Sequence, residues 1–415
     1  MRRLRTSGLL LLFPVLLVAA EQDAIAIDNT LRNRHLPYGT VLDPVLGRDG
    51  SIVSYTRCGD SAIWTGHYLA AEAFRYRTTG APQALENIRA ALAGITRLID
   101  VTGRDVLARC AIPGDSPYRA GIANEERAHG VFHATLDDRQ WVWIGHTSRD
   151  QYMGVFFGLA AAYDLVPDPE IRAGVTAQVT RLLGNLMSSA WNIVMPDGTI
   201  STTFLIRPDQ QLTLLQIGKY VNPSRFAADY TRAAGGLAYS VALPLTIDSA
   251  DAHSSYFKFN LAFINLFHLI RLETDPSTKN IYEGAFRIVR STTTNHRNAH
   301  FNMIDRALHG PNASRDAETL ADLDAWLTRP RMDVLVDLRG KVKACSENQA
   351  CQPIPVAQRS TTDFLWQRSP FQLYGGHRGR IESAGIDYLL PYWMARYYAV
   401  IEPRPSGSGA NAAER

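Results

Sequence analysis

The sequence predicts an all-α protein whose helical hairpins close into an α/α toroid. Three stretches, 59–100, 148–187 and 254–293, each pair two helical segments across a turn that contains Gly or Pro. The first segment of each pair is apolar nearly all round, and the second has a polar face, so inner and outer helices are expected. The connections are long and irregular, which favours a toroid over an open solenoid of fixed short period.

The first 20 residues have the layout of a secretory signal peptide. Arg2, Arg3 and Arg5 precede an apolar run over 9–18 that is too short to span a membrane. We therefore expect a secreted or periplasmic protein with no membrane span in the mature chain. Removing 1–20 takes away three arginines and no acids, so the formal charge falls from +3 to 0. A neutral mature chain gives no indication of nucleic-acid binding.

The mature chain is expected to form one domain over 21–403, followed by a disordered tail over 404–415. Strand signals are few and short. Buried inner helices are predicted at 153–165 and 259–270, and an outer helix at 170–187. Further helices are predicted at 208–217, 223–232, 315–327 and 384–400, and one short β segment at 198–204.

Four cysteines remain after export, where disulfides are chemically allowed. Three pairings are possible. The pairing that we favour joins Cys345 to Cys351 across a short loop and leaves Cys58 to pair with Cys110. The spacing does not suit a zinc ribbon, and neither a metal nor a cofactor is expected.

Two stretches carry a resemblance to a known superfamily. "SRDQYMGVFFGL" at 148–159 resembles the Arg-Gly-Gln-Gly/Ala-Trp segment that opens an inner helix in unsaturated glucuronyl hydrolases, and "GDSAIWTGHYLAAEAF" at 59–74 is similar to an earlier inner helix. Asp150 stands where that family has Gly, and Tyr152 where it has Trp. The resemblance is therefore to the six-hairpin glycosidase superfamily as a whole. It implies an (α/α)6 toroid and a carbohydrate-active enzyme of unspecified substrate.

Two aspartates are predicted to share one rim of the toroid. Asp60 lies 20 residues before the turn residue Gly80, and Asp150 lies 18 before Asp168 in its turn. Because these inner segments have similar lengths, their first residues should emerge at the same end. Each aspartate could instead cap its own helix. Glycoside hydrolysis requires two carboxyl groups, so Asp60 and Asp150 are the predicted catalytic pair.

Polar and aromatic residues around these helix starts are predicted to bind sugar. The Arg149 guanidinium and the Gln151 amide could hold a carboxylate or hydroxyls, although Arg149 could also simply pair with Asp150 or with a neighbouring helix. Trp141 and Trp143 alternate on an extended segment that leads to the rim, whereas aromatic residues in general are more often core. The predicted substrate-binding residues are Trp64, His67, Trp141, Trp143, Arg149, Gln151, Tyr152, His253, His300, Trp366, Glu382 and Asp387.

Two other segments contain polar residues that could reach the same rim. His296 and His300 are four residues apart, a spacing that could bind a metal with Asp305 on a helix, but the surrounding Asn and Thr residues favour a substrate-binding or structural loop. A glycine-rich loop is expected at 375–379, ahead of a last inner helix that Glu382 and Asp387 introduce.

Three functions remain open from the sequence. The first is a secreted glycoside hydrolase acting on an oligo- or polysaccharide. The second is a polysaccharide lyase or epimerase acting on uronates, with the base drawn from His67, His253, Tyr256, His296 and His300. The third is a toroid without chemistry that binds carbohydrate.

Overall fold

The computed structural model describes residues 21–253, 256–360 and 368–402. These residues form fourteen α-helices and eleven short β-strands, so the chain is mostly helical, as predicted. The predicted signal peptide, the C-terminal tail and Trp366 lie outside the described residues.

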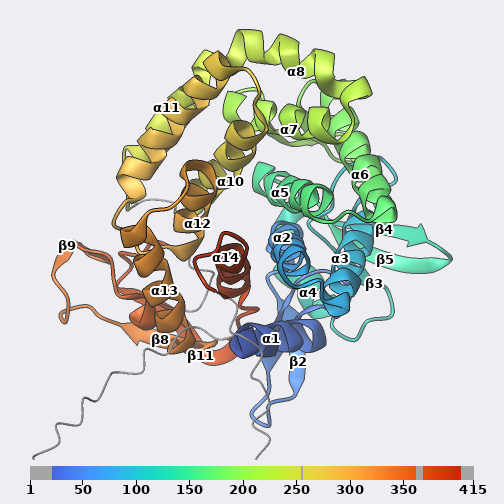
Figure 1. Ribbon diagram of the computed structural model, residues 1–415. Coiled ribbons are helices and arrows are strands. Elements are labelled where there is room, and N and C mark those ends of the chain that lie inside the picture. The colour runs from blue at the N-terminus through green and yellow to red at the C-terminus, as the bar shows by residue number, and fades with distance from the viewer. Residues whose placement is uncertain (1–20, 254–255, 361–367, 403–415) are drawn as a thin grey trace, which may run out of the picture.

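Six helices form an inner set in which each contacts the next, and the last returns to the first (Figure 1). Most of their side chains are buried, and the segments predicted as buried inner helices, 153–165 and 259–270, lie within this set. In order of contact the inner helices are α2 (Ser61–Thr79), α5 (Arg149–Leu165), α7 (Pro208–Val221), α10 (Phe257–Leu272), α12 (Ala299–His309) and α14 (Ile386–Tyr397).

Each inner helix packs against one outer helix (Figure 1). Five outer helices follow their inner partners in the chain, whereas α1, the first described helix, packs against α14, the last. The outer helices are α3 (Pro82–Asp100), α6 (Pro169–Ser188), α8 (Pro223–Leu237), α11 (Pro276–Thr293), α13 (Ala313–Leu327) and α1 (Glu21–Thr30). Two shorter helices, α4 (Arg119–Glu125) and α9 (Ala242–Ser249), lie in the connections.

Two outer helices, α6 and α11, begin at an aspartate that caps the helix and is followed by a proline. Asp168 accepts hydrogen bonds from the backbone N–H groups of Glu170 and Ile171, and Asp275 accepts one from Thr278. A proline follows each of these aspartates at the first helical position, where its missing N–H costs nothing. Asp168 therefore caps α6 at the turn of the hairpin, whereas Asp150 lies at the other end of α5, in its first turn.

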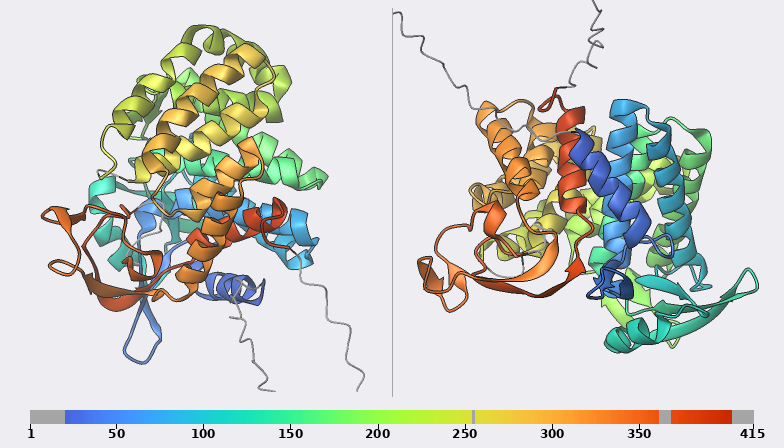
Figure 2. Two further views of the ribbon diagram at one scale, coloured as in Figure 1. Left: turned by 60° about the vertical axis from the view of Figure 1, so that its left-hand side comes forward. Right: turned by 90° about the horizontal axis from the view of Figure 1, so that it is seen from below.

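Short antiparallel sheets lie at one end of the helices (Figure 2). The largest has the order β2-β1-β11-β8, and the second has the order β3-β5-β4. Their strands are β1 (Asp43–Leu46), β2 (Ile52–Thr56), β8 (Met332–Asp337), β11 (Tyr374–Glu382), β3 (Cys110–Pro113), β4 (Val131–Leu136) and β5 (Arg139–Ile144). Two small hairpins complete the set, β6 (Asn192–Val194) with β7 (Ile200–Thr203), and β9 (Ala344–Ser346) with β10 (Gln349–Ala350).

Two expectations about loops were wrong. The glycine-rich stretch at 375–379 is part of β11, where Gly376 (φ +91°) passes so close to β8 that a Cβ would lie 2.0 Å from the carbonyl oxygen of Val334. The stretch after His296 is not a loop throughout, because α12 begins at Ala299. Asn298 caps this helix by accepting from the N–H groups of the two residues that follow Ala299.

Both predicted disulfides are present. Cys58 bonds to Cys110 across 52 residues, and Cys345 bonds to Cys351 across 6. Over the described ranges, no helix combines the length and the apolar character that a membrane crossing requires.

Candidate functional site

Glycines bring the two predicted catalytic aspartates together by allowing α2 and α5 to touch along their backbones. A Cβ on Gly66 of α2 would lie 2.0 Å from the carbonyl oxygen of Gly154 on α5, and a Cβ on Gly158 would lie 2.2 Å from that of Gly66. Such distances are far below van der Waals contact, so neither helix has room for a larger residue there. The close approach places the start of α2, with Asp60, beside the start of α5, with Asp150.

Gln151 connects the two carboxyl groups. Its Nε2 donates to Asp60 Oδ1 at 3.2 Å, and its backbone N–H donates to Asp150 Oδ1 at 3.0 Å. Its Oε1 accepts from the backbone N–H of Ile63 at 2.9 Å, which fixes the orientation of the amide. Because Gln151 is fully buried, this bridge is a rigid part of the site.

Arg109 makes a second connection between the same two helix starts. Its guanidinium donates to the carbonyl oxygens of Gly59 (2.8 Å) and His146 (3.1 Å) and to Ser148 Oγ (2.8 Å), and Nη1 lies 4.0 Å from Asp60 Oδ1. The Ser148 hydroxyl in turn donates to Asp150 Oδ1. Arg109 thus ties together the two loops that carry the aspartates.

The sequence analysis missed Arg109, although one signal pointed to it. The predicted disulfide from Cys58 to Cys110 places residue 109 next to the loop of Gly59 and Asp60. Glu126 was also missed. Its Oε1 accepts from the N–H of Gly59 at 2.7 Å, so a third, buried carboxyl group supports this loop.

The two aspartates differ in their local roles. Asp60 stands at the N-cap position of α2, but its side chain accepts no capping hydrogen bond from that helix, and about 32% of it is exposed. Asp150 accepts from the backbone N–H of Gln151 in the first turn of α5. The capping alternative therefore describes Asp150 in part and does not describe Asp60.

Arg149 does not pair with Asp150. Its Nη1 donates to the carbonyl oxygen of Thr203 at 2.9 Å and lies 3.4 Å from Thr202 Oγ1, on β7. Burial, and then the positive charge of Arg207, lower the pKa of Arg149. The guanidinium thus lies half-buried beside the start of α5.

A buried group of histidines extends the site from α2 towards α10 and α12. Trp64 and His67 follow Asp60 on α2, with their rings 5.3 Å apart. His67 Nδ1 lies 2.9 Å from the carbonyl oxygen of Ile63, so it carries the proton, and Nε2 is left to accept from the Asn260 amide at 3.2 Å. The His300 ring is 6.2 Å from that of His67.

These histidines are neutral at physiological pH. Burial lowers the pKa of His67 to about 4 and that of His300 well below its ordinary value. Neutral imidazoles and amides suit uncharged hydroxyl groups better than they suit carboxylates.

A tyrosine and a histidine lie together at the start of α10. Tyr256 Oη is 3.2 Å from His296 Nδ1, and both side chains are buried. Burial and then the charge of Arg359 lower the pKa of His296 to about 4, so His296 is neutral. Within the described residues, no three His, Cys, Asp or Glu side chains converge as metal ligands, either here or elsewhere.

The remaining predicted residues make contacts with partners other than the two aspartates. Tyr152 is fully buried, and its hydroxyl accepts from the N–H of Leu107 at 3.1 Å. Trp143 stacks on Phe132 at 4.4 Å within the β3-β5-β4 sheet, and the guanidinium groups of Arg97 and Arg139 both lie over the ring of Trp141. Residues 139–144 are extended, as predicted, and lead towards α5, but both tryptophans are buried by local packing.

Three further candidates make contacts of their own. His253 packs on Phe371 with ring centroids 4.2 Å apart. Glu382 ends β11 and pairs with Arg34 at 3.3 Å and with His35. Asp387, in the first turn of α14, is buried 3.6 Å from Arg329.

No protein-family model matches this chain, and no curated protein matches it.

Proposed function

We propose that the six hairpins close into an (α/α)6 toroid and that the protein is a glycoside hydrolase with Asp60 and Asp150 as its catalytic carboxyl groups. The observation that carries the proposal is the contact of one residue, Gln151, with both carboxyl groups. The circuit of inner helices and the resemblance of 148–159 and 59–74 to six-hairpin glycosidases support the same proposal.

The surroundings suggest different tasks for the two aspartates. Asp60, which is partly exposed and near the Arg109 guanidinium, takes the role of the ionised group that attacks the anomeric carbon or activates water. Asp150 takes the role of the acid. It accepts its described hydrogen bonds on Oδ1, so Oδ2 is left to carry the proton for the leaving oxygen.

The first prediction tests these roles by substitution. Asp60→Asn and Asp150→Asn are each expected to lower turnover by about 10²-fold or more, because general acid–base catalysis typically contributes that much. The mature protein is first screened for new reducing ends on neutral and acidic polysaccharides, and the variants are assayed on the best substrate.

Asp229→Asn is the matched control. Asp229 pairs with Arg225 and Arg232 on the surface of the outer helix α8, and exposed pairs contribute little. Turnover should stay as in the wild type. Full turnover by folded Asp60→Asn and Asp150→Asn proteins would refute the proposed roles.

A lyase is the second candidate, and the proximity of Tyr256 and His296 favours it. A neutral histidine beside a tyrosine, with Arg359 nearby to offset a uronate carboxylate, has the parts that proton abstraction requires. Lyase products contain a new double bond and absorb in the near ultraviolet, whereas hydrolase products do not. Absorbance that appears with Asp60→Asn and is lost with Tyr256→Phe would replace the hydrolase proposal with a lyase.

We also propose that the protein works outside the cytoplasm. Two disulfides persist most readily in an oxidising compartment, and the predicted signal peptide agrees with export.

A further inference from the structure

A groove outside the proposed active site shows a separate chemistry. It runs between the loop after α1, the outer helix α3 and the sheet β3-β5-β4, and it consists of two hollows of about 750 and 450 Å³ that meet at Arg139 and Trp141. We call it the Arg97 groove. It shares no lining residue with the Asp60 and Asp150 network. Its larger hollow has the volume of a typical small-ligand site.

The groove contains an arginine without a carboxylate partner among the described residues. Arg97 Nη1 donates to the backbone carbonyl of Tyr38 at 2.6 Å, and no described carboxylate forms an ion pair with it. Burial, and then the charge of Arg139, lower its pKa, while Asp137 acts in the opposite direction. The positive charge of Arg97 is therefore poorly compensated.

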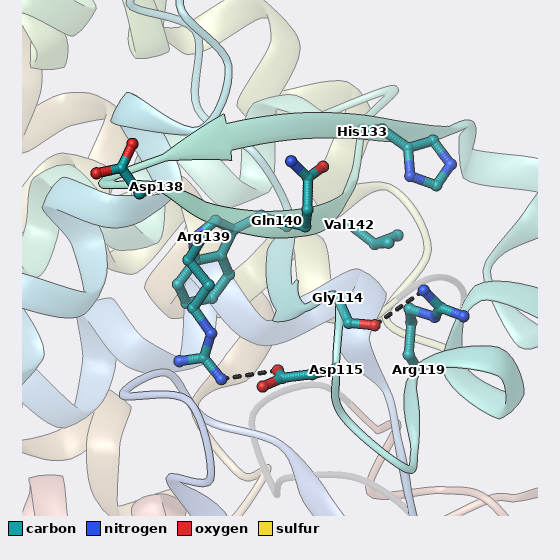
Figure 3. Close-up of a pocket in the computed structure, with 9 residues that line it drawn as sticks. Gly114, Asp115, Arg119, His133, Asp138, Arg139, Gln140 and Val142 are labelled. Atoms are coloured by element: carbon teal, nitrogen blue, oxygen red, sulfur yellow. Dashed lines mark hydrogen bonds and ion pairs between the residues drawn. The ribbon is translucent and has the colours of Figure 1, made fainter.

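Trp141 holds the two arginines close together. The Arg97 guanidinium carbon lies 5.1 Å from the centre of the indole, and that of Arg139 lies 5.3 Å from it. Arg139 is paired with Asp115 at 2.8 Å, as Figure 3 shows, and both side chains are at least half exposed. Among the described residues, Asp115 is the one carboxylate that forms an ion pair with either arginine, whereas Asp137 acts on Arg97 without an ion pair and Asp138 lines the smaller hollow. An anionic ligand would relieve the repulsion between the two guanidinium groups.

Flat apolar groups line the same walls. Tyr38 and Tyr118 are half-buried, and prolines at positions 37, 113 and 117 line the same hollow. Figure 3 shows the polar side chains of Gln140 and His133 along the other hollow. Aromatic and proline surfaces beside guanidinium groups and polar side chains suit a sugar ring that carries a negative group, because the C–H faces of sugars pack on such surfaces and the anion pairs with arginine.

We propose that the Arg97 groove binds an acidic saccharide, through its carboxylate or sulfate group, at a site separate from the catalytic mouth. The ligand is held by Arg97 and Arg139 and is packed against Tyr38 and Tyr118. This site stands on the groove alone and does not require Asp60 and Asp150 to be catalytic.

The test uses the mature protein with the Asp60→Asn substitution, so that the proposed hydrolysis does not consume the probe. The probes are the galacturonic acid trisaccharide and its fully methyl-esterified form, which has the same rings without the charge. Binding is measured by titration calorimetry at low and at physiological salt. We expect the acid to bind more tightly than the ester, and we expect its affinity to fall as the salt concentration rises.

Two substitutions are expected to act in opposite directions. Arg97→Gln removes the uncompensated charge and keeps a donor for Tyr38, and it should weaken binding of the acid by about tenfold or more. Asp115→Asn frees Arg139 from its ion pair. Binding of the acid should become a few-fold tighter, because one competing anion is lost. Neither change should alter binding of the ester by more than about twofold.

Arg89→Gln is the matched control, since Arg89 lies on the same helix α3 but pairs with Asp168 outside the groove. It should leave binding of the acid unchanged. Any one of three results would overturn the proposal. The Arg97→Gln variant could bind the acid as tightly as the parent protein, the acid and the ester could bind equally well, or the Asp115→Asn variant could bind the acid more weakly. Asp115 is 75% exposed, so this variant keeps the test decisive if the Arg97→Gln protein fails to fold. Failure of the hydrolase proposal is read separately, from the turnover of Asp60→Asn.

Discussion

At the scale of single residues, the most consequential buried group outside the site is Glu72. It lies fully buried on α2, where Arg75 Nη1 contacts both Glu72 at 3.0 Å and Asp28 at 2.8 Å, and the Asn87 amide donates to Glu72 at 2.7 Å. Burial, and then the negative charge of Asp28, raise the pKa of Glu72 to about 8. Glu72 and Asp28 therefore share Arg75, and Asp28 has a second partner in Arg32 at 3.2 Å, whereas Glu72 forms no second ion pair among the described residues.

The second prediction concerns the pH dependence of stability. Because the pKa of Glu72 is higher in the folded state than its ordinary value of 4.5, its contribution is fully present below pH 4.5 and is lost as the pH rises to about 8. Glu72→Gln should remove this loss, which amounts to a few kcal/mol. Urea unfolding at several pH values between 5 and 8 measures the difference.

Glu86→Gln is the control for that series, because Glu86 is exposed on the neighbouring helix α3. The slope of its unfolding free energy with pH should match that of the wild type. A Glu72→Gln protein with the wild-type slope would show that Glu72 is ionised throughout the range.

At the scale of elements, glycine determines how the site is assembled. The third prediction is that Gly66→Ala and Gly158→Ala each destabilise the protein by about 1–3 kcal/mol or more, because their new methyl groups would meet backbone atoms of the facing helix. Gly184→Ala, on the outer helix α6, meets nothing within 4 Å and should stabilise the protein by about 0.5–1 kcal/mol.

Thermal unfolding measures these effects, and turnover provides a second readout. Gly66→Ala forces α2 away from α5, so it should also impair the contact of Gln151 with Asp60 and lower activity, whereas Gly184→Ala should not. If Gly66→Ala and Gly184→Ala had the same effect on stability, the close backbone contact would be wrong.

Elements were predictable where local pattern decides them. Most of the inner and outer helices, the extended segment 139–144 and both disulfide pairings followed from apolar periodicity, turn residues and cysteine spacing, whereas α1 and α12 were not predicted. A strand and a helix were expected to be loops. Gly376 belongs to β11, where its close contact with β8 leaves no room for a side chain. Asn298 caps α12, whose polar residues gave no clear helical pattern.

Part of the site followed from the sequence as well. The equal lengths of the inner arms predicted that Asp60 and Asp150 emerge at one end, and Gln151 joins them there. The positions of the Tyr152 and Trp141 side chains could not be predicted from the sequence, because the direction in which a buried aromatic side chain points depends on its tertiary neighbours. The role of Arg109 likewise depends on its contacts with two segments that are distant from it in sequence, at residue 59 and at 146–148.

At the scale of the whole molecule, the two disulfides should differ in what they stabilise. The fourth prediction is that replacing Cys58 and Cys110 by alanine lowers the free energy of unfolding by about 4 kcal/mol, against about 2 kcal/mol for Cys345 and Cys351, because the first closes the longer loop. Denaturant unfolding of the two double variants measures this comparison.

The same two variants should differ in activity. Cys58 and Cys110 flank Gly59 and Arg109, which position Asp60, so their loss should lower turnover, whereas loss of the 345–351 bridge should leave it unchanged. Equal stability losses together with equal activity losses would contradict a special role for the first disulfide.

The contact between α1 and α14 joins the two ends of the described chain, and the pairing of β1 with β11 does the same in the sheet. A ribosome that has made all but the last helix has therefore produced a chain whose core is still open at its seam. The contacts of α14 and β11 with the N-terminal part of the chain can form only after these last elements have been synthesised, so closure of this seam is the last step of folding that synthesis permits.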